Sequence, residues 1–128
     1  MTMKYYSEDH QWVEIVGDEA VVGLSEYAVE PGTEVSLVEL PEEDTDFIIG
    51  DKFVDLEYEG GEAVELYSPV SGTVTSVNET LLDDPSLIFD ADEEKSWICR
   101  FANIDIDEVN DMMNEDAYFR YLRKLGKV

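Results

Sequence analysis

The chain has 128 residues, of which 32 are acidic and 8 are basic, and its formal net charge is -24. Such a charge repels phosphate groups, so it argues against nucleic acids and anionic membranes as partners. Because 44% of the residues are hydrophobic, the chain can still bury a core, and we expect one folded domain over residues 1–128.

The acidic residues are distributed along the whole chain rather than gathered in one segment. This distribution is typical of a solvated surface whose charges repel one another. It suits either a salty habitat or a basic protein partner, and the sequence leaves both explanations open.

Short apolar runs separated by turn residues dominate residues 1–101. They predict β-strands at residues 12–16, 20–24, 34–40, 46–49, 52–59, 62–67, 73–77 and 97–101. Gly17-Asp18 joins the first two strands in a hairpin. Ser25 is a suitable N-cap for a helical turn over residues 25–30, which Pro31-Gly32 would end.

The strand predicted at residues 52–59 has the clearest two-residue period. Apolar and acidic residues alternate from Val54 to Glu59, so one face is expected to be buried and the other wet. Phe53 lies out of phase with this alternation. Gly60-Gly61 supplies the flexible backbone of a tight turn, which predicts a hairpin with the next strand.

After residue 101 the apolar period changes from two residues to three or four. A short helix over residues 106–113 is predicted from Ile106, Val109, Met112 and Met113, with Asp105 as its N-cap. A second helix is predicted from one apolar stripe, formed by Ala117, Tyr118, Tyr121, Leu122 and Leu125. We expect this stripe to pack on the sheet rather than bind a partner. Strands followed by helices indicate a mainly β fold, a small sandwich or barrel with short helices and a C-terminal helix.

Histidine and cysteine, which many metal sites and catalytic sites require, occur once each. His10 is the one histidine and Cys99 the one cysteine, and their separation in sequence gives little support to a metal site or a catalytic triad. Cys99 lies in a predicted strand, which indicates a buried free thiol. Residues 90–101 begin like an EF-hand loop, but Lys95 stands where glycine is needed and Phe101 where glutamate is needed. We therefore predict no metal site and no catalytic residues.

The sequence has no apolar run near the ~18 residues of a transmembrane helix. Residues 1–6 also lack the apolar core of a signal peptide. These observations predict a cytoplasmic protein.

Separated motifs along the chain follow a known family pattern. The most specific is Tyr67-Ser68-Pro69-Val70-Ser71-Gly72, directly after the predicted hairpin. The other motifs are Tyr6–Trp12, Val22–Ala28, Val38–Pro41, Val77–Glu79, Asp84–Ile88, Trp97 and Ala117-Tyr118. In this order, and over nearly the whole chain, they resemble the glycine cleavage H-protein family.

The resemblance implies a lipoyl-type barrel-sandwich hybrid with added helices. It also implies a carrier rather than an enzyme. Members of this family hold lipoate on a hairpin lysine and carry an aminomethyl group between the other glycine cleavage components, which are a pyridoxal-phosphate decarboxylase, a folate-dependent aminomethyltransferase and a dihydrolipoamide dehydrogenase. The cofactor performs the chemistry, and the domain presents it to successive active sites.

This chain departs from the family at the lysine itself. Counting forward from Gly50 places Gly60 at the lipoyl-lysine position, and counting back from Tyr67 places Gly61 there. Neither residue has an amine, so no lipoate and no other cofactor is expected. We therefore predict a non-lipoylated homologue that acts as a binding or accessory protein, with glycine cleavage or lipoate-handling proteins as its candidate partners.

The acidic residues of the hairpin have two interpretations. They are either a solvated surface or a contact for a basic partner, and the candidate contact residues are Glu57, Glu59, Glu62 and Glu65. Two other functions remain as alternatives. The chain is a lipoyl carrier modified at an atypical lysine such as Lys52, or it is an acidic enzyme built on a borrowed fold.

Overall fold

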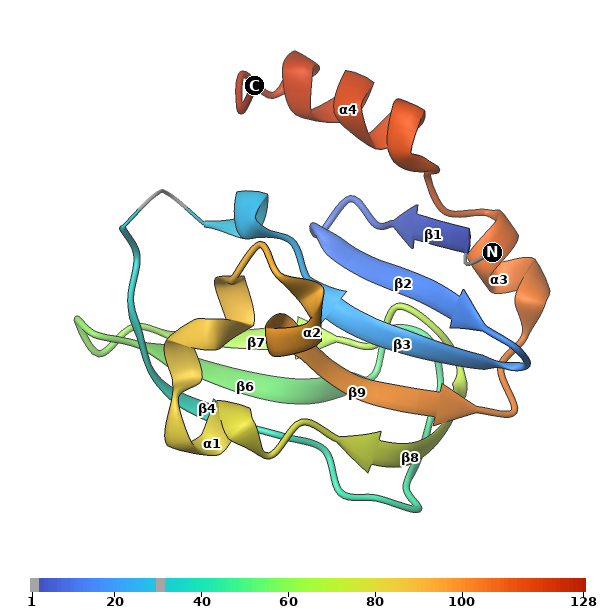
Figure 1. Ribbon diagram of the computed structural model, residues 1–128, viewed down its shortest axis with the longest axis horizontal. Helices are drawn as coiled ribbons and strands as arrows, with labels where there is room; N and C mark the ends of the chain where they lie inside the picture. The colour runs from blue at the N-terminus through green and yellow to red at the C-terminus, as the bar shows by residue number, and fades with distance from the viewer. Residues whose placement is uncertain (1–2, 30–31) are drawn as a thin grey trace.

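The structure, a computed structural model, describes residues 3–29 and 32–128 (Figure 1). Its strands form two antiparallel sheets. The six-stranded sheet contains, in spatial order, β1 (Met3–Tyr6), β2 (Gln11–Val16), β3 (Glu19–Leu24), β9 (Trp97–Ala102), β8 (Gly72–Val77) and β5 (Asp46–Phe47). The three-stranded sheet contains β4 (Val35–Glu39), β6 (Lys52–Tyr58) and β7 (Ala63–Tyr67).

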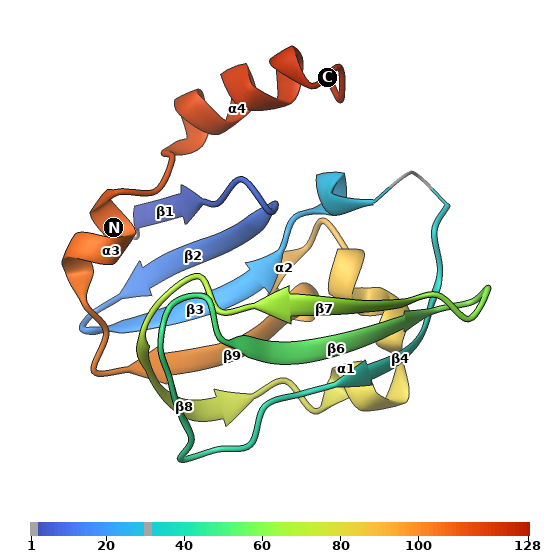
Figure 2. The same cartoon turned by 180° about the vertical axis from the view of Figure 1, so that it is seen from behind.

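Short helices lie between the strands and after the last of them. They are η1 (Glu26–Ala28), α1 (Thr80–Asp83), η2 (Pro85–Phe89), α2 (Glu93–Ser96), α3 (Ile106–Asn110) and α4 (Glu115–Lys124). Seen from behind, α4 lies beside β1, whereas α1 lies next to β4 (Figure 2). Ser25 caps η1 as predicted, because its hydroxyl oxygen accepts a hydrogen bond from Tyr27 N.

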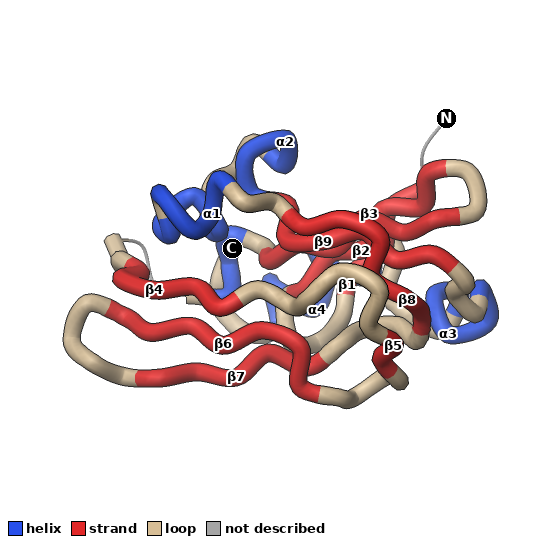
Figure 3. The backbone as a smooth tube through the Cα atoms, turned by 90° about the horizontal axis from the view of Figure 1, so that it is seen from below, coloured by secondary structure: helices blue, strands red, loops and turns tan. Residues whose placement is uncertain are grey.

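The core lies between the two sheets, which face each other in the view from below (Figure 3). Phe101 from β9 is fully buried, and its ring centroid lies 6.3 Å from that of Phe47 and 6.2 Å from that of Phe53. The rings therefore join β5, β6 and β9 across the two sheets. The predicted architecture is confirmed as a mainly β barrel-sandwich hybrid with short helices and a C-terminal helix.

A β-bulge explains why Phe53 is out of phase in the sequence. Lys52 pairs with Tyr67 and Val54 with Leu66, so Phe53 is the extra residue on its strand. Both Phe53 and Val54 are buried. A regular strand would point one of two successive side chains to solvent, and the bulge removes this conflict.

The structure adds a strand that the sequence analysis missed. β1 pairs with β2, and its last residue, Tyr6, exchanges two main-chain hydrogen bonds with Met113, at N–O distances of 2.7 and 3.0 Å. The acidic segment after Asp92 forms a short helix, α2, for which no helix was predicted. Asp92 caps α2, because its carboxylate accepts a hydrogen bond from Glu94 N.

The predicted helix at residues 106–113 is shorter than expected. α3 ends at Asn110, and the side chain that it buries is Val109. Ile106 is 48% exposed, so the apolar residues of this helix do not all share its buried side. The N-cap is confirmed, because the Asp105 carboxylate accepts a hydrogen bond from Asp107 N.

The apolar stripe of α4 packs on the chain's own sheet through two residues. Tyr118 and Leu122 are buried, and the Tyr118 ring stacks on Tyr6 with a centroid distance of 4.2 Å. This confirms the predicted packing for the centre of the stripe. Leu125, at the end of the helix, remains 46% exposed.

Among the described residues, no helix has both the length and the apolar character that a membrane crossing requires.

Candidate functional site

The hairpin between β6 and β7 projects beyond the rest of its sheet at one end of the molecule (Figure 1). Its turn is closed by two main-chain hydrogen bonds, from Gly61 N to Tyr58 O at 2.9 Å and from Tyr58 N to Glu62 O at 2.8 Å. Gly61 has a φ of 89°. This is the three-residue hairpin loop in which a β-turn is followed by a left-handed residue, and glycine adopts that conformation without strain.

The two glycines of the tip have different constraints. Gly60 has no positive φ, and a Cβ atom added to it would meet nothing within 4 Å. A Cβ at Gly61 would also find open space, but the left-handed backbone disfavours any other residue there. The structure thus puts both glycines at the exposed tip, with no amine at either residue. The tip does not fit lipoate, because the lipoyl amide bond requires a primary amine.

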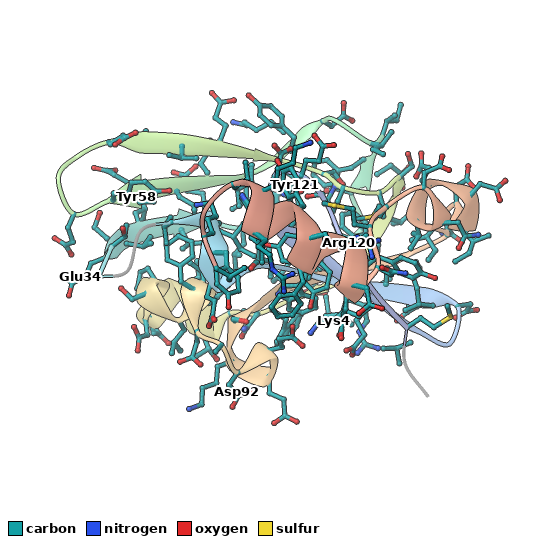
Figure 4. The ribbon with its side chains drawn as sticks, turned by 90° about the horizontal axis from the view of Figure 1, so that it is seen from above. Lys4, Glu34, Tyr58, Asp92, Arg120 and Tyr121 are labelled. Atoms are coloured by element: carbon teal, nitrogen blue, oxygen red, sulfur yellow. The ribbon has the colours of Figure 1, made fainter. Side chains whose placement is uncertain are left out.

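The base of the turn is attached to the neighbouring strand. Glu59 N donates to Glu34 O at 3.0 Å, which continues the pairing of β4 with β6 almost to the tip. Glu34 and Tyr58 lie at the same end of the molecule when it is viewed from above, and Lys4 lies in the other half (Figure 4). The hairpin is therefore a supported structure rather than a free loop.

The four candidate contact residues do not share one face. Glu57 pairs with Ala63, and Glu65 follows two residues later, so Glu57 and Glu65 lie diagonally on the outer face of the sheet. Glu62 is opposite Tyr58, which lies on the same face of β6 as the buried residues Val54 and Leu56. Glu59 belongs to the turn. The carboxylate of Glu62 contributes to raising the pKa of Tyr58, after the larger effect of burial.

The outer face carries a row of carboxylates that spans all three strands. Glu39 of β4 pairs with Asp55 of β6, and Asp55 pairs with Glu65 of β7. Adjacent like charges destabilise a sheet. Lys52 offsets part of this repulsion, because its Nζ lies 2.9 Å from Asp55 Oδ2.

Lys52 lies at the base of the hairpin and not at its tip. It pairs with Tyr67 and is exposed, with its ammonium bound to Asp55. The hydrogen bond and the charge of Asp55 raise the pKa of Lys52, with smaller contributions from the nearby carboxylates. Its ammonium is thus held against Asp55 at the side of the hairpin and is not presented freely, as an amine at the tip would be.

A cleft of about 200 Å³ lies beside β7, between the two sheets. Leu24, Ala28, Leu56 and Val64 supply apolar lining, and Asp9 and Glu65 are also among the residues around the cleft. Gln11 is buried near it and donates from Nε2 to Tyr67 O at 2.9 Å, which joins β2 to the end of β7. This role of Gln11 was not predictable, because a lone polar residue before a tryptophan gives no signal for such a contact.

The other candidate residues have structural roles. Cys99 is fully buried, and burial raises the pKa of its thiol well above the ordinary value, so it is not a nucleophile. His10 Nδ1 lies 2.9 Å from Tyr118 Oη, which in turn donates to Ser25 Oγ at 3.0 Å. Among the described residues no group of three or more potential ligands could hold a metal ion.

Comparison with known proteins agrees with this architecture. The family model described as "Glycine cleavage H-protein" matches residues 4–125. The chain is 38% identical to a glycine cleavage system H protein of Paramagnetospirillum magneticum over 98% of this chain and 99% of that protein. It is 40% identical to a probable H protein of Thermococcus kodakarensis over 94% of this chain and 90% of that protein.

A solved structure is also similar. The crystal structure of a glycine cleavage system H protein from Mycobacterium marinum superposes with a TM-score of 0.77 at 25% identity, covering 96% of each chain. The sequence motifs, the barrel-sandwich hybrid and these matches agree. The chain belongs to the glycine cleavage H-protein family.

Proposed function

We propose that this chain is an H-protein homologue that is not lipoylated and acts as a binding or accessory protein rather than as an aminomethyl carrier. The observation that carries this proposal is the hairpin tip. It is a fully formed turn with glycines at residues 60 and 61 and no primary amine. A carrier needs an amine at an exposed tip, because the ligase must reach it and the loaded arm must swing from it.

The distribution of lysines supports the proposal. The sequence contains no lysine between Lys52 and Lys95. Lys52 is bound to Asp55, and Lys95 belongs to α2. Lys4 is largely buried and is paired with Glu93. None of these three amines is presented as a tip lysine would be.

The alternative is a carrier that is modified at Lys52. The side chain is 49% exposed and lies in the same hairpin, which favours this residue over other lysines. Its salt bridge and its place seven residues before the turn argue against it, since a ligase that recognises a hairpin tip would meet Glu59 and the glycines instead.

Intact mass spectrometry tests the proposal directly. The chain is coexpressed with a lipoate ligase and supplied with lipoate, beside a lipoylated H protein as the positive control. We expect the unmodified mass for this chain. A lipoyl increment that the Lys52→Arg variant abolishes would establish the alternative function.

A designed lysine asks whether the amine is all that the tip lacks. Gly60→Lys keeps the backbone of the turn, whereas Gly61→Lys places a side chain at a φ of 89°. We therefore expect Gly60→Lys to be lipoylated more completely than Gly61→Lys. If Gly60→Lys folds normally and remains unmodified, the surrounding carboxylates also prevent recognition by the ligase, and the loss of carrier function goes beyond one side chain.

The accessory role has a separate test. Purified glycine cleavage components and a lipoate-handling ligase are passed one at a time over the immobilised chain, at low and at high salt. We expect retention of at least one of them at low salt, weakened by high salt because the acidic surface contributes. Retention of none would reject the accessory role.

A further inference from the structure

Within residues 3–29 and 32–128 the two sheets have four edges, and three of them are short, interrupted or partly covered. The edge of β1 is bonded to Met113, and β5 has only two residues. At the start of β4, η2 occupies the outward main-chain groups of Val35, where Ser86 Oγ lies 3.4 Å from both N and O, and a register shift between Val35 and Leu37 interrupts the rest of this edge. β7 is the remaining edge strand, and an edge strand that is left uncovered is a template for another strand.

The main-chain groups of β7 that face outward follow from its pairing. Tyr58 N donates to Glu62 O, so Tyr58 and Glu62 are a hydrogen-bonded pair. Antiparallel pairs alternate, so Ala63 and Glu65 direct their N–H and C=O groups away from β6. In the described parts of the chain no hydrogen bond fills these positions. Tyr67, the next residue in phase, has its outward carbonyl occupied by Gln11.

The cleft beside β7 gives this edge specificity. A strand added there would place every second side chain on the inner face, beside Val64 and the apolar lining from Leu24 and Ala28. Its other side chains would lie on the outer face, beside Glu65 and the exposed ring of Tyr67. The two faces of an added strand thus meet an apolar surface and an acidic surface.

We infer that the edge of β7 binds an extended segment of a partner protein in which basic and apolar residues alternate. This inference rests on the proposed function, and it gives the accessory protein a mode of docking. Unpaired main-chain groups on Ala63 and Glu65 supply hydrogen bonds, the cleft takes the apolar side chains, and the carboxylates attract the basic ones. A second copy of this chain is the wrong occupant, because its own β7 carries Glu65 and no basic residue, so the two acidic strands would repel each other.

The test uses a nine-residue peptide of alternating lysine and valine as the probe. Ala63→Pro removes one outward N–H without changing any charge, and proline is tolerated where an edge N–H faces solvent. Ala63→Ser is the matched control that keeps the N–H. Glu65→Gln removes one carboxylate and keeps the main chain. Binding is measured by titration calorimetry at low and at moderate salt.

We expect the peptide to bind the native chain and Ala63→Ser alike, and to bind Ala63→Pro at least tenfold more weakly. Glu65→Gln should weaken binding about two- to threefold, with a smaller effect at higher salt. Equal binding to Ala63→Pro would overturn the inference, because the peptide would then be held by charge alone. Absence of binding to the native chain would overturn it as well.

Hydrogen exchange on the native chain makes the test independent of how well the proline variant folds. The amides of Ala63 and Glu65 should exchange more slowly when the peptide is bound, while those of Val64 and Leu66, already paired with β6, should change little. Unchanged exchange at Ala63 and Glu65 would reject docking at this edge. Self-association that Ala63→Pro abolishes would assign the edge to a second copy and also reject the inference.

Failure of the docking inference can be distinguished from failure of the proposed function. Peptide binding is measured on protein produced without lipoate, so a later finding that Lys52 is lipoylated would reject the non-carrier proposal and leave the edge measurement unaffected. Conversely, an unmodified mass together with unprotected β7 amides would reject only the docking inference.

Discussion

The β6–β7 hairpin and the region where α4 packs are stabilised in different ways. The hairpin is held by main-chain hydrogen bonds, and its tip side chains are exposed. The α4 region depends on particular side chains, with Tyr118 stacked on Tyr6 and bonded to both His10 and Ser25. Main-chain geometry tolerates many side chains, whereas a buried polar and aromatic contact tolerates few. The comparison explains how the tip can lack a lysine while the scaffold is retained.

The largest effect is expected from truncating the buried face of α4. Leu122→Ala removes a side chain with no exposed surface, so the free energy of unfolding should fall by about 2–5 kcal/mol. Phe119→Ala is the matched control, because Phe119 is on the same helix and half exposed. It should change stability by about 0.5 kcal/mol or less. Denaturant unfolding measures both, and equal losses would mean that α4 is not held as described.

The second prediction tests the polar part of the same region. Tyr118→Phe removes the hydroxyl that joins His10 to Ser25 and should cost about 1–2 kcal/mol. Tyr121→Phe removes a longer and more exposed contact to Glu8 O, at 3.4 Å, and should cost far less. Thermal unfolding of the two variants compares them. A Tyr118→Phe protein as stable as the native chain would contradict the proposed network.

At the hairpin the expected effects depend on backbone geometry rather than contacts. Gly61→Ala forces a residue with a Cβ into the left-handed region and should cost about 1–2 kcal/mol. Gly60→Ala, with open space and no positive φ, should cost about 0.5 kcal/mol or less. The order of the two stabilities, measured by denaturant unfolding, is the test. The reverse order would mean that the turn has another conformation in solution.

The smallest effect concerns pH. Burial, and then the charge of Lys127, lower the pKa of His10 in the folded chain, with Asp9 opposing them in part. The fold therefore favours the neutral ring. Its contribution to stability is fully present above the unfolded pKa of about 6.5 and is lost as the pH falls through the folded pKa.

The comparison of native chain with His10→Asn isolates this contribution. Asparagine is suitable because residue 10 has a φ of 64°, a conformation that asparagine tolerates better than most residues. Both proteins carry the same carboxylates, so the effect of these groups cancels in the comparison. Between pH 7 and pH 5 the native chain should therefore lose more stability than the variant. An equal loss in both would contradict the neutral state of His10.

Much of the fold was predictable because a strand produces a local pattern of alternating side chains in the sequence. The alternation from Val54 to Glu59 and the glycines at the turn predicted the hairpin, and the C-terminal helix followed from its stripe. β1 was missed because Met3–Tyr6 has no alternation, and it is held by pairing with β2 and with Met113. The exposure of Ile106 was missed because periodicity locates a helix more reliably than it orients a short one.

The site was predictable in part for the same reason. The sequence placed two glycines at the tip, but it could not tell which of them adopts the left-handed conformation. It grouped four glutamates as one contact, whereas strand pairing separates Glu62 from Glu57 and Glu65. It gave no sign of the cleft or of Gln11, whose partner lies 56 residues away along the chain.

The sequence by itself determined that the hairpin tip has no amine, because the chemistry of a residue does not depend on how the chain folds. It also determined the alternation that builds the strands, because a side-chain period is a local property. Only the tertiary structure decided that η2 covers the start of β4 and that β7 is left open beside a cleft. These features depend on packing between segments far apart in the chain, which no local pattern records.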